Sequence, residues 1–331
     1  MTAKKRTVTV TGATGFVGRA FVARLAREKK YHIRCLVRRS SDLSALRALD
    51  ADIAFYYGDI TRKETLMQAF DGAWGAVNLA GYREFWSQRA SQFYDLNERG
   101  AKNVFRACLN AGVEKVVQVS TPLSYGVPNT IPFNELTSVG RHPSDYARSK
   151  YLGDQAGWRL HEEEDLPLSI VYLAAVIGAG DDKATMEVRR AVDRKLPALI
   201  GADTTYTYLY VQDAGDAILR ALEKKATVGR SYLIGNQRAT TREYFDTIGR
   251  LADVPVPTWN IPEFWLMPLA KGMDVLARKT GRRPLLPLDV LRTTAAGSLL
   301  FDASRGIREL GMSYTPLETA LAESVAEIRA R

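Results

Sequence analysis

Tyr146 and Lys150 are a pair of residues whose types and spacing suit proton transfer. On a helix, two residues four apart project from one face, one turn from each other. An ammonium beside a phenol favours the phenolate, and a phenol that titrates near pH ~10 needs such help near neutral pH. A lone Tyr-x-x-x-Lys pattern also occurs on ordinary exposed helix surfaces. Its interpretation therefore depends on the rest of the chain.

A glycine-rich loop near the N-terminus supports the catalytic interpretation. Residues 11–18 read TGATGFVG and place Gly12, Gly15 and Gly18 between a predicted strand and a predicted helix. Glycines there let the backbone turn tightly and approach a pyrophosphate, while the helix N-terminus offers free N–H groups. This spacing differs from the commonest G-x-G-x-x-G fingerprint, but its position after the first strand predicts a dinucleotide site.

The end of the second predicted strand indicates which nicotinamide cofactor is preferred. NAD-binding proteins carry an acid there for the ribose 2′-hydroxyl, whereas an arginine accommodates the 2′-phosphate of NADP. Here Arg38 and Arg39 follow Val37, and the first acid, Asp42, comes only after two serines. A guanidinium suits phosphate by charge and geometry. We predict that NADP(H) is preferred over NAD(H), with surface arginines as the alternative interpretation.

Alternating strands and helices must position these groups. Short β-branched or apolar runs alternate with amphipathic helices, which predicts parallel βαβ units in a doubly wound α/β Rossmann sheet. Beyond residue 178 prolines, glycines and short helices replace this rhythm, with isolated strand-like pieces at 207–211 and 231–235. We predict a Rossmann domain at 1–176 with returning segments near 205–236, and a smaller, mainly helical substrate lobe at 177–204 and 237–331. The predicted strands are 7–11, 32–37, 53–57, 76–80, 115–120 and 168–173, and the predicted helices include 16–29, 43–49, 65–70 and 93–111.

Composition narrows the class of protein. The chain has 331 residues, is 46% hydrophobic and 25% charged, and carries a net charge of +9. The hydrophobic and charged fractions are ordinary for a globular protein. The net positive charge is notable and suits either a solvated basic surface or an anionic ligand. The two cysteines and three histidines lack disulfide or metal spacing, so we expect no metal. We also expect no nucleic-acid partner and no membrane span. Since no signal-like apolar segment opens the chain, we expect a cytoplasmic location.

Taken in order, the motifs resemble those of the extended short-chain dehydrogenases/reductases, the NAD-dependent epimerase/dehydratase superfamily. The resemblance covers nearly the whole chain. It rests on the glycine loop, Asp59, the 78–81 strand end NLAG and the Tyr146/Lys150 pair. It is supported by Asn97 in LNERG, Ser120-Thr121 before Tyr125-Gly126, Val211-Gln-Asp213, Phe301-Asp302-Ala-Ser304 and Glu309-Leu-Gly311.

The resemblance implies roles for particular residues. Tyr146 would be the general acid/base, and Lys150 would lower its pKa and hold the nicotinamide ribose. Thr121, four residues before Tyr125, would hydrogen-bond the reacting oxygen, with Ser120 as the adjacent alternative and Asn97 as a further catalytic residue. Tyr82, Phe85 and Trp86 would form a substrate wall together with Thr121. The implied cofactor-binding residues are Gly12, Thr14, Gly15, Phe16, Val17, Gly18, Arg38, Arg39, Asp59, Ile60, Leu79, Ala80, Gly81, Tyr146, Lys150, Leu173 and Val176.

Departures from the family pattern bear on the substrate. Tyr172 and Leu173 stand where the family often has Arg-Pro, and the following turn is Gly178-Ala-Gly180. With the missing acid after the second strand, this weakens the case for a UDP-sugar epimerase with tightly bound NAD. The nearest resemblance is to dihydroflavonol-reductase-like enzymes, 3β-hydroxysteroid-dehydrogenase-like enzymes and hopanoid-associated sugar epimerases.

Residues 261–279 combine apolar and basic side chains and allow three interpretations. The segment could be an amphipathic helix covering the core, a lid over a lipophilic substrate, or a basic helix that touches an anionic membrane. Peripheral membrane contact therefore stays open among the partners we consider.

For the whole chain, the sequence favours an NADP(H)-dependent oxidoreductase that interconverts a secondary alcohol and a ketone on a fairly apolar small molecule. One alternative is a nucleotide-sugar or hopanoid-linked sugar epimerase or dehydratase that recycles its cofactor. A second is a non-catalytic NADP-sensing regulator or assembly factor; such proteins often lose the Tyr/Lys pair that this chain keeps. We also expect a homodimer through the helices that start near residues 93 and 146, with Ala156 and Gly157 exposed for pairing.

Overall fold

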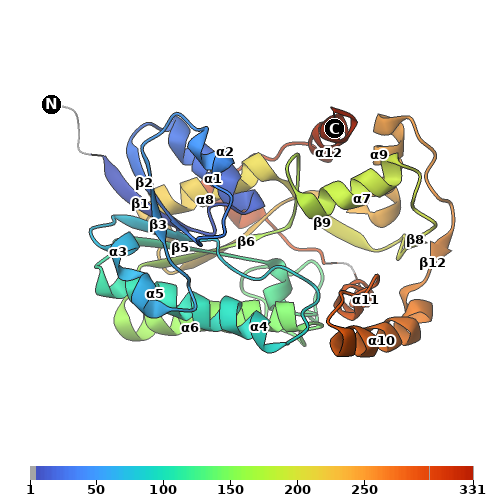
Figure 1. Cartoon of the computed structure of the whole chain (residues 1–331), viewed down its shortest axis with the longest axis horizontal. Helices are drawn as coiled ribbons and strands as arrows, with labels where there is room; N and C mark the ends of the chain where they lie inside the picture. The colour runs from blue at the N-terminus through green and yellow to red at the C-terminus, as the bar shows by residue number, and fades with distance from the viewer. Residues whose placement is uncertain (1–4, 298, 331) are drawn as a thin grey trace.

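The computed structural model describes residues 5–297 and 299–330. A seven-stranded parallel sheet forms the centre of the fold (Figure 1). The strand order is β10-β6-β5-β4-β1-β2-β3, and every neighbouring pair is parallel. The predicted doubly wound Rossmann sheet is thereby confirmed. Its strands are β1 (Arg6–Thr11), β2 (Tyr31–Val37), β3 (Ile53–Tyr57), β4 (Gly75–Asn78), β5 (Lys115–Ser120), β6 (Leu168–Leu173) and β10 (Arg230–Ile234).

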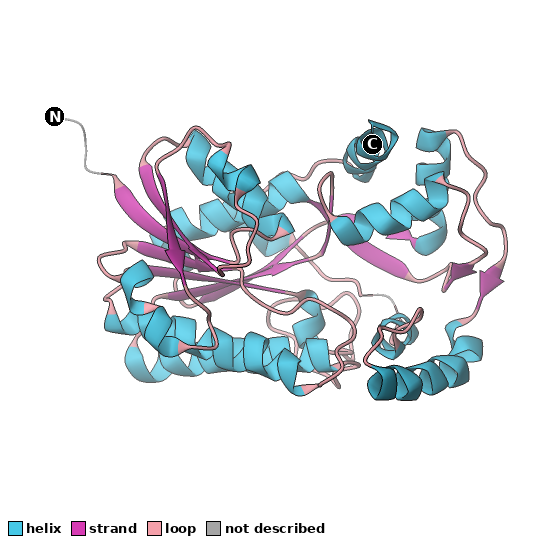
Figure 2. Cartoon of the chain, viewed as in Figure 1, coloured by secondary structure: helices cyan, strands magenta, loops and turns pink. Residues whose placement is uncertain are grey.

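Helices cover both faces of this sheet (Figure 2). On one face α1 (Phe16–Arg27) packs against α8 (Val211–Glu223), and on the other α5 packs against α6. Two covered faces explain why consecutive residues of a strand, rather than every second one, are buried in β4 and β6. The remaining helices around the sheet are α2 (Ser44–Arg47), α3 (Met67–Phe70), α4 (Ser91–Tyr94), α5 (Ala101–Asn110) and α6 (Asp145–Glu164).

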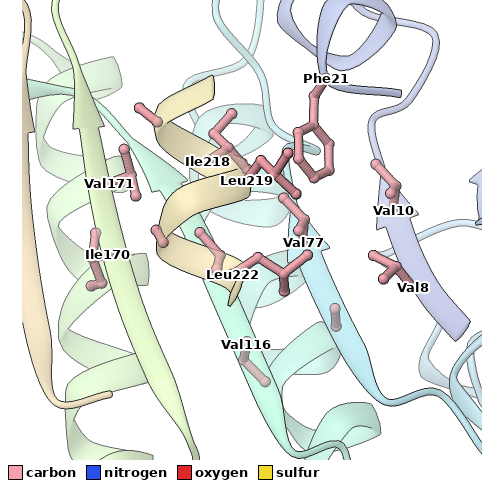
Figure 3. Packing of buried hydrophobic residues seen from close by; sticks show 14 of the residues in the cluster. Val8, Val10, Phe21, Val77, Val116, Ile170, Val171, Ile218, Leu219 and Leu222 are labelled. Carbon is pink, nitrogen blue, oxygen red and sulfur yellow. The ribbon is translucent and has the colours of Figure 1, made fainter. Parts of the chain in front are cut away.

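The main hydrophobic core lies between α8 and the middle of the sheet (Figure 3). Ile218, Leu219 and Leu222 of α8 are fully or almost fully buried and lie over the strands that carry Val77 and Val116. Burying a side chain of this size stabilises a fold by about 1.5–3 kcal/mol. The position of α8 therefore follows from its spacing of apolar residues, which repeats every three to four positions.

A second, smaller group of elements follows the sheet (Figure 1). It contains a three-stranded sheet of order β11-β9-β7 and the short parallel pair β8 and β12. Its own hydrophobic cluster joins α7, α9 and α12 through residues such as Ile248, Leu321 and Val325. The elements are β7 (Ala175–Ile177), β8 (Leu199–Ile200), β9 (Thr205–Tyr210), β11 (Gln237–Thr240), β12 (Asn260–Ile261), α7 (Asp182–Val192), α9 (Thr241–Ala252), α10 (Glu263–Thr280), α11 (Leu288–Ala295) and α12 (Leu317–Ala330).

The sequence suggested two isolated strand-like pieces, but both of them pair with other strands in the structure. The piece at 231–235 belongs to β10, which pairs with β6 and forms an edge of the main sheet. The piece at 207–211 belongs to β9, which pairs with β7 and β11. Local patterning predicted both strands but could not show their partners, because β10 starts 230 − 173 = 57 residues after β6 ends.

The predicted helix over 93–111 is interrupted at its start. It begins as α4, passes through a π-helical turn at Asp95–Gly100 and continues as α5. Single π-helical turns of this kind are frequent at functional sites. The expectation that Gly157 is exposed for subunit pairing is wrong, since a Cβ there would meet Leu168 and Phe105 at 2.9 Å.

None of the helices in the described part of the chain is both long enough and apolar enough to cross a bilayer.

Candidate active site

The site begins where the strand order of the sheet reverses, at the carboxyl ends of β1 and β4. Gly12, after β1, has φ +68°, and a Cβ there would lie 2.6 Å from the Ala80 nitrogen. A Cβ at Gly18 would lie 2.1 Å from the Gly12 carbonyl oxygen. Side chains at these two positions are therefore excluded, and the crevice at this switch point stays open to a ligand.

The N-terminus of α1 faces this crevice and suits an anion. Gly15 is its N-cap, no side chain caps the helix, and no acidic residue stands in its first turn. The first N–H groups of the helix and its positive dipole end are thus available to a phosphate. The glycine loop and the helix end together fit the pyrophosphate of a dinucleotide.

A cavity of about 830 Å³ extends from this loop into the C-terminal region. Its lining contains the predicted catalytic and cofactor-binding residues except Arg39, and the predicted substrate residues except Trp86. The structure therefore brings together Gly12, Thr14, Gly15, Phe16, Val17, Gly18, Arg38, Asp59, Ile60, Leu79, Ala80, Gly81, Tyr82, Phe85, Asn97, Ser120, Thr121, Tyr146, Lys150, Leu173 and Val176.

At one end of the cavity, Arg38 and Ser41 line the region after β2. The Ser41 hydroxyl accepts a hydrogen bond from the Arg38 backbone N–H at 3.2 Å, which fixes this turn. Burial raises the pKa of the nearby Asp59, but hydrogen bonds from Thr61 and the charge of Arg38 lower it overall. Arg39 lies outside the cavity lining, and its guanidinium lies 5.6 Å from the centre of the Tyr57 ring.

At the middle of the cavity, α6 presents Tyr146 and Lys150. The helix starts at Asp145 because the Ser144 hydroxyl caps it, accepting from the Ala147 N–H at 3.2 Å. Thr121 and Tyr146 line the same part of the cavity. Burial raises the pKa of Tyr146 to about 12, while the charge of Arg83 and the side chain of Thr121 act in the opposite direction.

Lys150 and Ser120 are held by buried partners. The Lys150 ammonium donates to the Val119 carbonyl oxygen at 2.8 Å. Burial lowers the pKa of Lys150, and the negative charge of Asp154 opposes that effect. The Ser120 hydroxyl donates to an Asp154 carboxylate oxygen at 2.6 Å. Ser120 is thereby engaged by Asp154, whereas Thr121 acts to lower the pKa of the phenol.

Asn97 holds the segment that walls the cavity. Buried in the π-helical turn, its side-chain oxygen accepts from the Tyr82 N–H at 2.7 Å, and its amide nitrogen donates to the Tyr82 carbonyl at 3.0 Å. The same nitrogen donates to the Ser149 hydroxyl at 2.9 Å. Asn97 thus ties the 82–86 segment to the helix that carries Tyr146, and its contacts make it a positioning residue.

The cavity beyond Tyr146 is mostly apolar. The Phe85 ring meets the Tyr146 ring edge-to-face, with centroids 5.6 Å apart. Trp86 lies outside this wall, although its carbonyl accepts a hydrogen bond from the Tyr82 hydroxyl at 3.2 Å. Apolar residues from three parts of the chain complete the wall: Leu123, Val127, Pro128, Ile131, Ala296 and Leu299.

Sequence reasoning missed two charged residues of the site. Arg83 lines the cavity, acts on the Tyr146 phenol and donates to the buried Asp181 carboxylate at 3.2 Å. Asp154 is buried behind Lys150. The position of Asp154, one further turn after Lys150 on the same face, was a signal that could have identified it. No pattern in the sequence pointed to Arg83, which lies on an irregular segment.

A parallel doubly wound sheet, a glycine loop at its switch point and a Tyr/Lys pair in the same cavity define a nicotinamide-dependent enzyme of the short-chain dehydrogenase/reductase type. The chain belongs to the NAD-dependent epimerase/dehydratase family, whose sequence profile matches residues 8–235.

Individual relatives extend this match over the full chain. A Synechocystis sp. protein provisionally named dihydroflavonol 4-reductase is 26% identical over 325 residues, covering 96% of this chain and 92% of its own. Sterol demethylase protein B of Methylococcus capsulatus is 28% identical over 334 residues, covering 98% of this chain and 99% of its own. The crystal structure of gox2253 superposes with a TM-score of 0.83 at 28% identity and covers 98% of both chains.

Proposed function

We propose that this enzyme is an NADP(H)-dependent oxidoreductase that interconverts a secondary alcohol and a ketone on a fairly apolar small molecule. The observation that carries the proposal is that Thr121 and Tyr146 line one cavity, with Thr121 acting to lower the pKa of the phenol, and that the far wall of this cavity is apolar. A hydroxyl and a phenol that share one site can hold the same substrate oxygen from two sides.

The candidate catalytic residues have distinct roles in the proposed reaction. Tyr146 gives a proton to the substrate oxygen during reduction and takes it back during oxidation. Thr121 would orient that oxygen by a hydrogen bond, and Lys150, one turn further along α6, would hold the nicotinamide ribose. When bound, the nicotinamide cofactor supplies or accepts the hydride. Phe85 and its apolar neighbours exclude water from the reacting carbon.

The preference for NADP(H) rests on Arg38. This residue lines the cavity at the end of β2 together with Ser41, where a 2′-phosphate would be accommodated. An exposed guanidinium and a hydroxyl are suitable partners for a phosphate. We expect the purified enzyme to bind NADPH more tightly than NADH in a fluorescence titration. Equal affinities would contradict the preference.

Replacement of Tyr146 by phenylalanine tests the catalytic assignment. Tyr146→Phe removes only the phenolic hydroxyl, so we expect turnover to fall by roughly 10²–10⁴-fold, as for loss of a general acid/base. NADPH affinity should stay within about twofold, since the ring is retained. Turnover is followed as a change in NADPH absorbance, and affinity by titration.

Tyr151→Phe is the matched control for this substitution. Tyr151 lies on the same helix but outside the cavity lining, where its ring packs near that of His142. This variant should keep wild-type turnover. Unchanged turnover in Tyr146→Phe would rule out the proposed role of the phenol.

The same assay separates the oxidoreductase from the epimerase or dehydratase alternative. An enzyme that recycles its cofactor retains it through purification and consumes no net NADPH. An oxidoreductase exchanges cofactor with each turnover. The apolar wall favours an oxidoreductase that exchanges its cofactor, because a nucleotide-sugar substrate would require polar partners for its phosphates and sugar.

Three further assignments stay predictions of the same proposal. We propose that 1–176 with 205–236 forms the cofactor domain, and that 177–204 and 237–331 form the substrate lobe. We also propose a cytoplasmic location and a homodimer through α5 and α6. Sedimentation of the purified protein at several concentrations would test the dimer.

A further inference from the structure

The helix α10 turns an apolar surface to solvent. Of its 18 residues, only Ala270 and Ala277 are buried. Trp265 is 70% exposed, Phe264 64% and Leu276 62%. Large apolar side chains scattered singly on a surface need no explanation, but a contiguous group of them marks a contact site. The other strongly exposed apolar side chains of the helix are Leu269 and Val275.

The spacing of these residues places them on one side of the helix. Two adjacent rows run along it, residues 264, 268, 271 and 275, and residues 265, 269, 272 and 276. Steps of four, three and four residues follow one face of an α-helix. Ala270, on the opposite side, packs with Leu288 and Leu291 of α11. Figure 1 shows α10 at the periphery of the molecule with α11 beside it.

The segment is also basic. Residues 263–283 contain five Lys or Arg and two Asp or Glu, so their net charge is 5 − 2 = +3. Arg278 donates to Asp274 at 2.8 Å, and Arg283 pairs with Glu84 at 3.1 Å. Within the described part of the chain, Lys271, Lys279 and Arg282 take part in no ion pair. Their side chains are exposed, so these charges are available to an anionic surface.

We propose that the outward face of α10 docks onto the surface of an anionic lipid bilayer. A helix with tryptophan, phenylalanine and leucine on one face and cations beside them lies in the plane of the membrane interface. Each exposed Lys or Arg near an anionic surface adds to the attraction. At a rise of ~1.5 Å per residue, α10 is long enough to present several side chains to the headgroup region at once.

Two other interpretations of this helix fit the structure less well. It is not an ordinary core-covering helix, because its largest apolar residues face away from the protein. It is not a lid over the described cavity, because no residue of α10 belongs to the described lining, whereas Thr293 of α11 does. An external occupant is therefore needed, and the charge of the segment favours an anionic one.

The docking surface is connected to the cavity wall. Gly281, which ends α10, lies against the Gln88 side chain, and Glu84 pairs with Arg283. Tyr82 and Phe85, in the same segment as Glu84, line the cavity. A docked enzyme would thus hold its substrate wall near the bilayer. That consequence rests on the proposed function, whereas membrane binding itself does not.

Vesicle flotation of the full chain tests the proposal. The probes are phosphatidylcholine vesicles and vesicles of equal parts phosphatidylcholine and phosphatidylglycerol. We expect the wild-type protein to float with the anionic vesicles, to remain with the aqueous phase for phosphatidylcholine alone, and to dissociate in high salt. Trp265→Ser combined with Leu276→Ser should weaken binding at least about tenfold, and Lys271→Glu combined with Lys279→Glu should do the same.

Matched controls use exposed residues on other elements. Met67→Ser, on α3, removes an exposed apolar side chain, and Lys225→Glu, which precedes β10, reverses an exposed charge. Both controls should float like the wild type. Circular dichroism checks that each variant is folded, and turnover of a water-soluble ketone should be unchanged in all of them.

Three results would overturn the proposal. The first is wild-type protein that does not float with anionic vesicles, and the second is equal loss of binding in the control variants. The third is a smaller sedimenting mass for the Trp265/Leu276 variant than for the wild type, which would assign the face to contact with a second copy of this chain. Absence of turnover in wild-type protein that floats as expected would instead count against the proposed function alone.

Discussion

Asp154 completes a row of side chains on α6, one turn beyond Lys150, which is itself one turn beyond Tyr146. A buried polar chain lies beside it. The Gln118 side chain acts to lower the pKa of the Asp154 carboxyl and accepts a hydrogen bond from the Asn78 amide at 2.7 Å. Asn78 accepts in turn from the Thr11 hydroxyl at 2.5 Å, directly before the glycine loop. Hydrogen bonds therefore link side chains of three neighbouring strands, β5, β4 and β1, as far as the start of the glycine loop.

The pKa of Asp154 gives a testable pH dependence. Burial raises it to about 6, against the opposing effects of Lys150 and Ser120. A carboxyl whose folded pKa is raised contributes stability that is complete below its unfolded value, near pH 3.8, and that is lost as the pH rises through about 6. In Asp154→Asn this loss is absent, so the variant should gain up to about 3 kcal/mol relative to wild type between these two pH values.

Denaturant unfolding of both proteins across this pH window measures the difference. The relative gain should level off above about pH 6, where Asp154 is already ionised. Asp253→Asn, at an exposed helix end, is the control and should follow the wild-type pH profile. A constant difference between Asp154→Asn and wild type over the whole window would contradict the raised pKa.

The convergence of the candidate catalytic residues in one cavity could be predicted from the sequence. The glycine loop directly follows β1 and Thr121 directly follows β5, while Tyr146 and Lys150 lie on α6, and all of them line the cavity. Arg83 and the outward position of Arg39 could not be predicted, because both depend on side-chain directions in irregular segments. The position of Trp86 outside the cavity has the same origin.

At the scale of elements, the caps decide where helices begin. Thr240 is the N-cap of α9 and forms a capping box with Glu243. The Thr240 hydroxyl accepts a hydrogen bond from the Glu243 N–H at 3.1 Å, and a Glu243 carboxylate oxygen accepts one from the Thr240 N–H at 2.8 Å. These bonds satisfy N–H groups that the helix itself leaves without partners. The hydrophobic cluster of the C-terminal region depends on α9 through Tyr244 and Ile248.

Removal of this cap should destabilise the fold. Thr240→Ala is expected to lower the free energy of unfolding by about 1 kcal/mol, the usual cost of losing an N-cap side chain. Chemical denaturation followed by circular dichroism measures it. Thr247→Ala, in the middle of the same helix, should have little effect, because alanine has the better helix propensity there. Equal destabilisation by both substitutions would show that the cap is not the cause.

The boundaries of elements were less predictable than their existence. The π-helical turn at Asp95–Gly100 has the composition of an ordinary helix, and only the contacts of Asn97 with Tyr82 and Ser149 show what it positions. Likewise, the apolar content of α10 predicted a helix, but not that its apolar face is turned outward.

At the scale of the molecule, part of the predicted substrate lobe packs into the core of the main sheet. Phe301, Ala303, Leu310 and Met312, from the predicted substrate lobe, belong to the main hydrophobic cluster of the sheet. Residue patterns could not predict this packing, because it joins segments far apart in the chain. The two cysteines belong to the same cluster: Cys35 lies on β2 and Cys108 on α5, and both are fully buried.

The cysteines therefore report on the integrity of the whole sheet. Burial raises the pKa of both thiols, that of Cys35 to about 12, and the thiolate is the reactive form. We expect a thiol reagent to label neither residue in the native protein and both in denaturant. Labelling should proceed at the rate of unfolding, and Cys108→Ala should halve the signal. Rapid native labelling would contradict the burial of these residues.

The position of β10 has a consequence for synthesis. During translation, the strands up to β6 leave the ribosome before β10 exists, so one edge of the nascent sheet keeps unpaired backbone groups. At ~5–20 residues per second, the 56 residues between β6 and β10 take several seconds to make. Helix α8, which packs against α1, also emerges in this interval. The nascent chain is therefore most prone to aggregation before residues 211–234 have emerged, and a chaperone that binds open sheet edges would act at this stage.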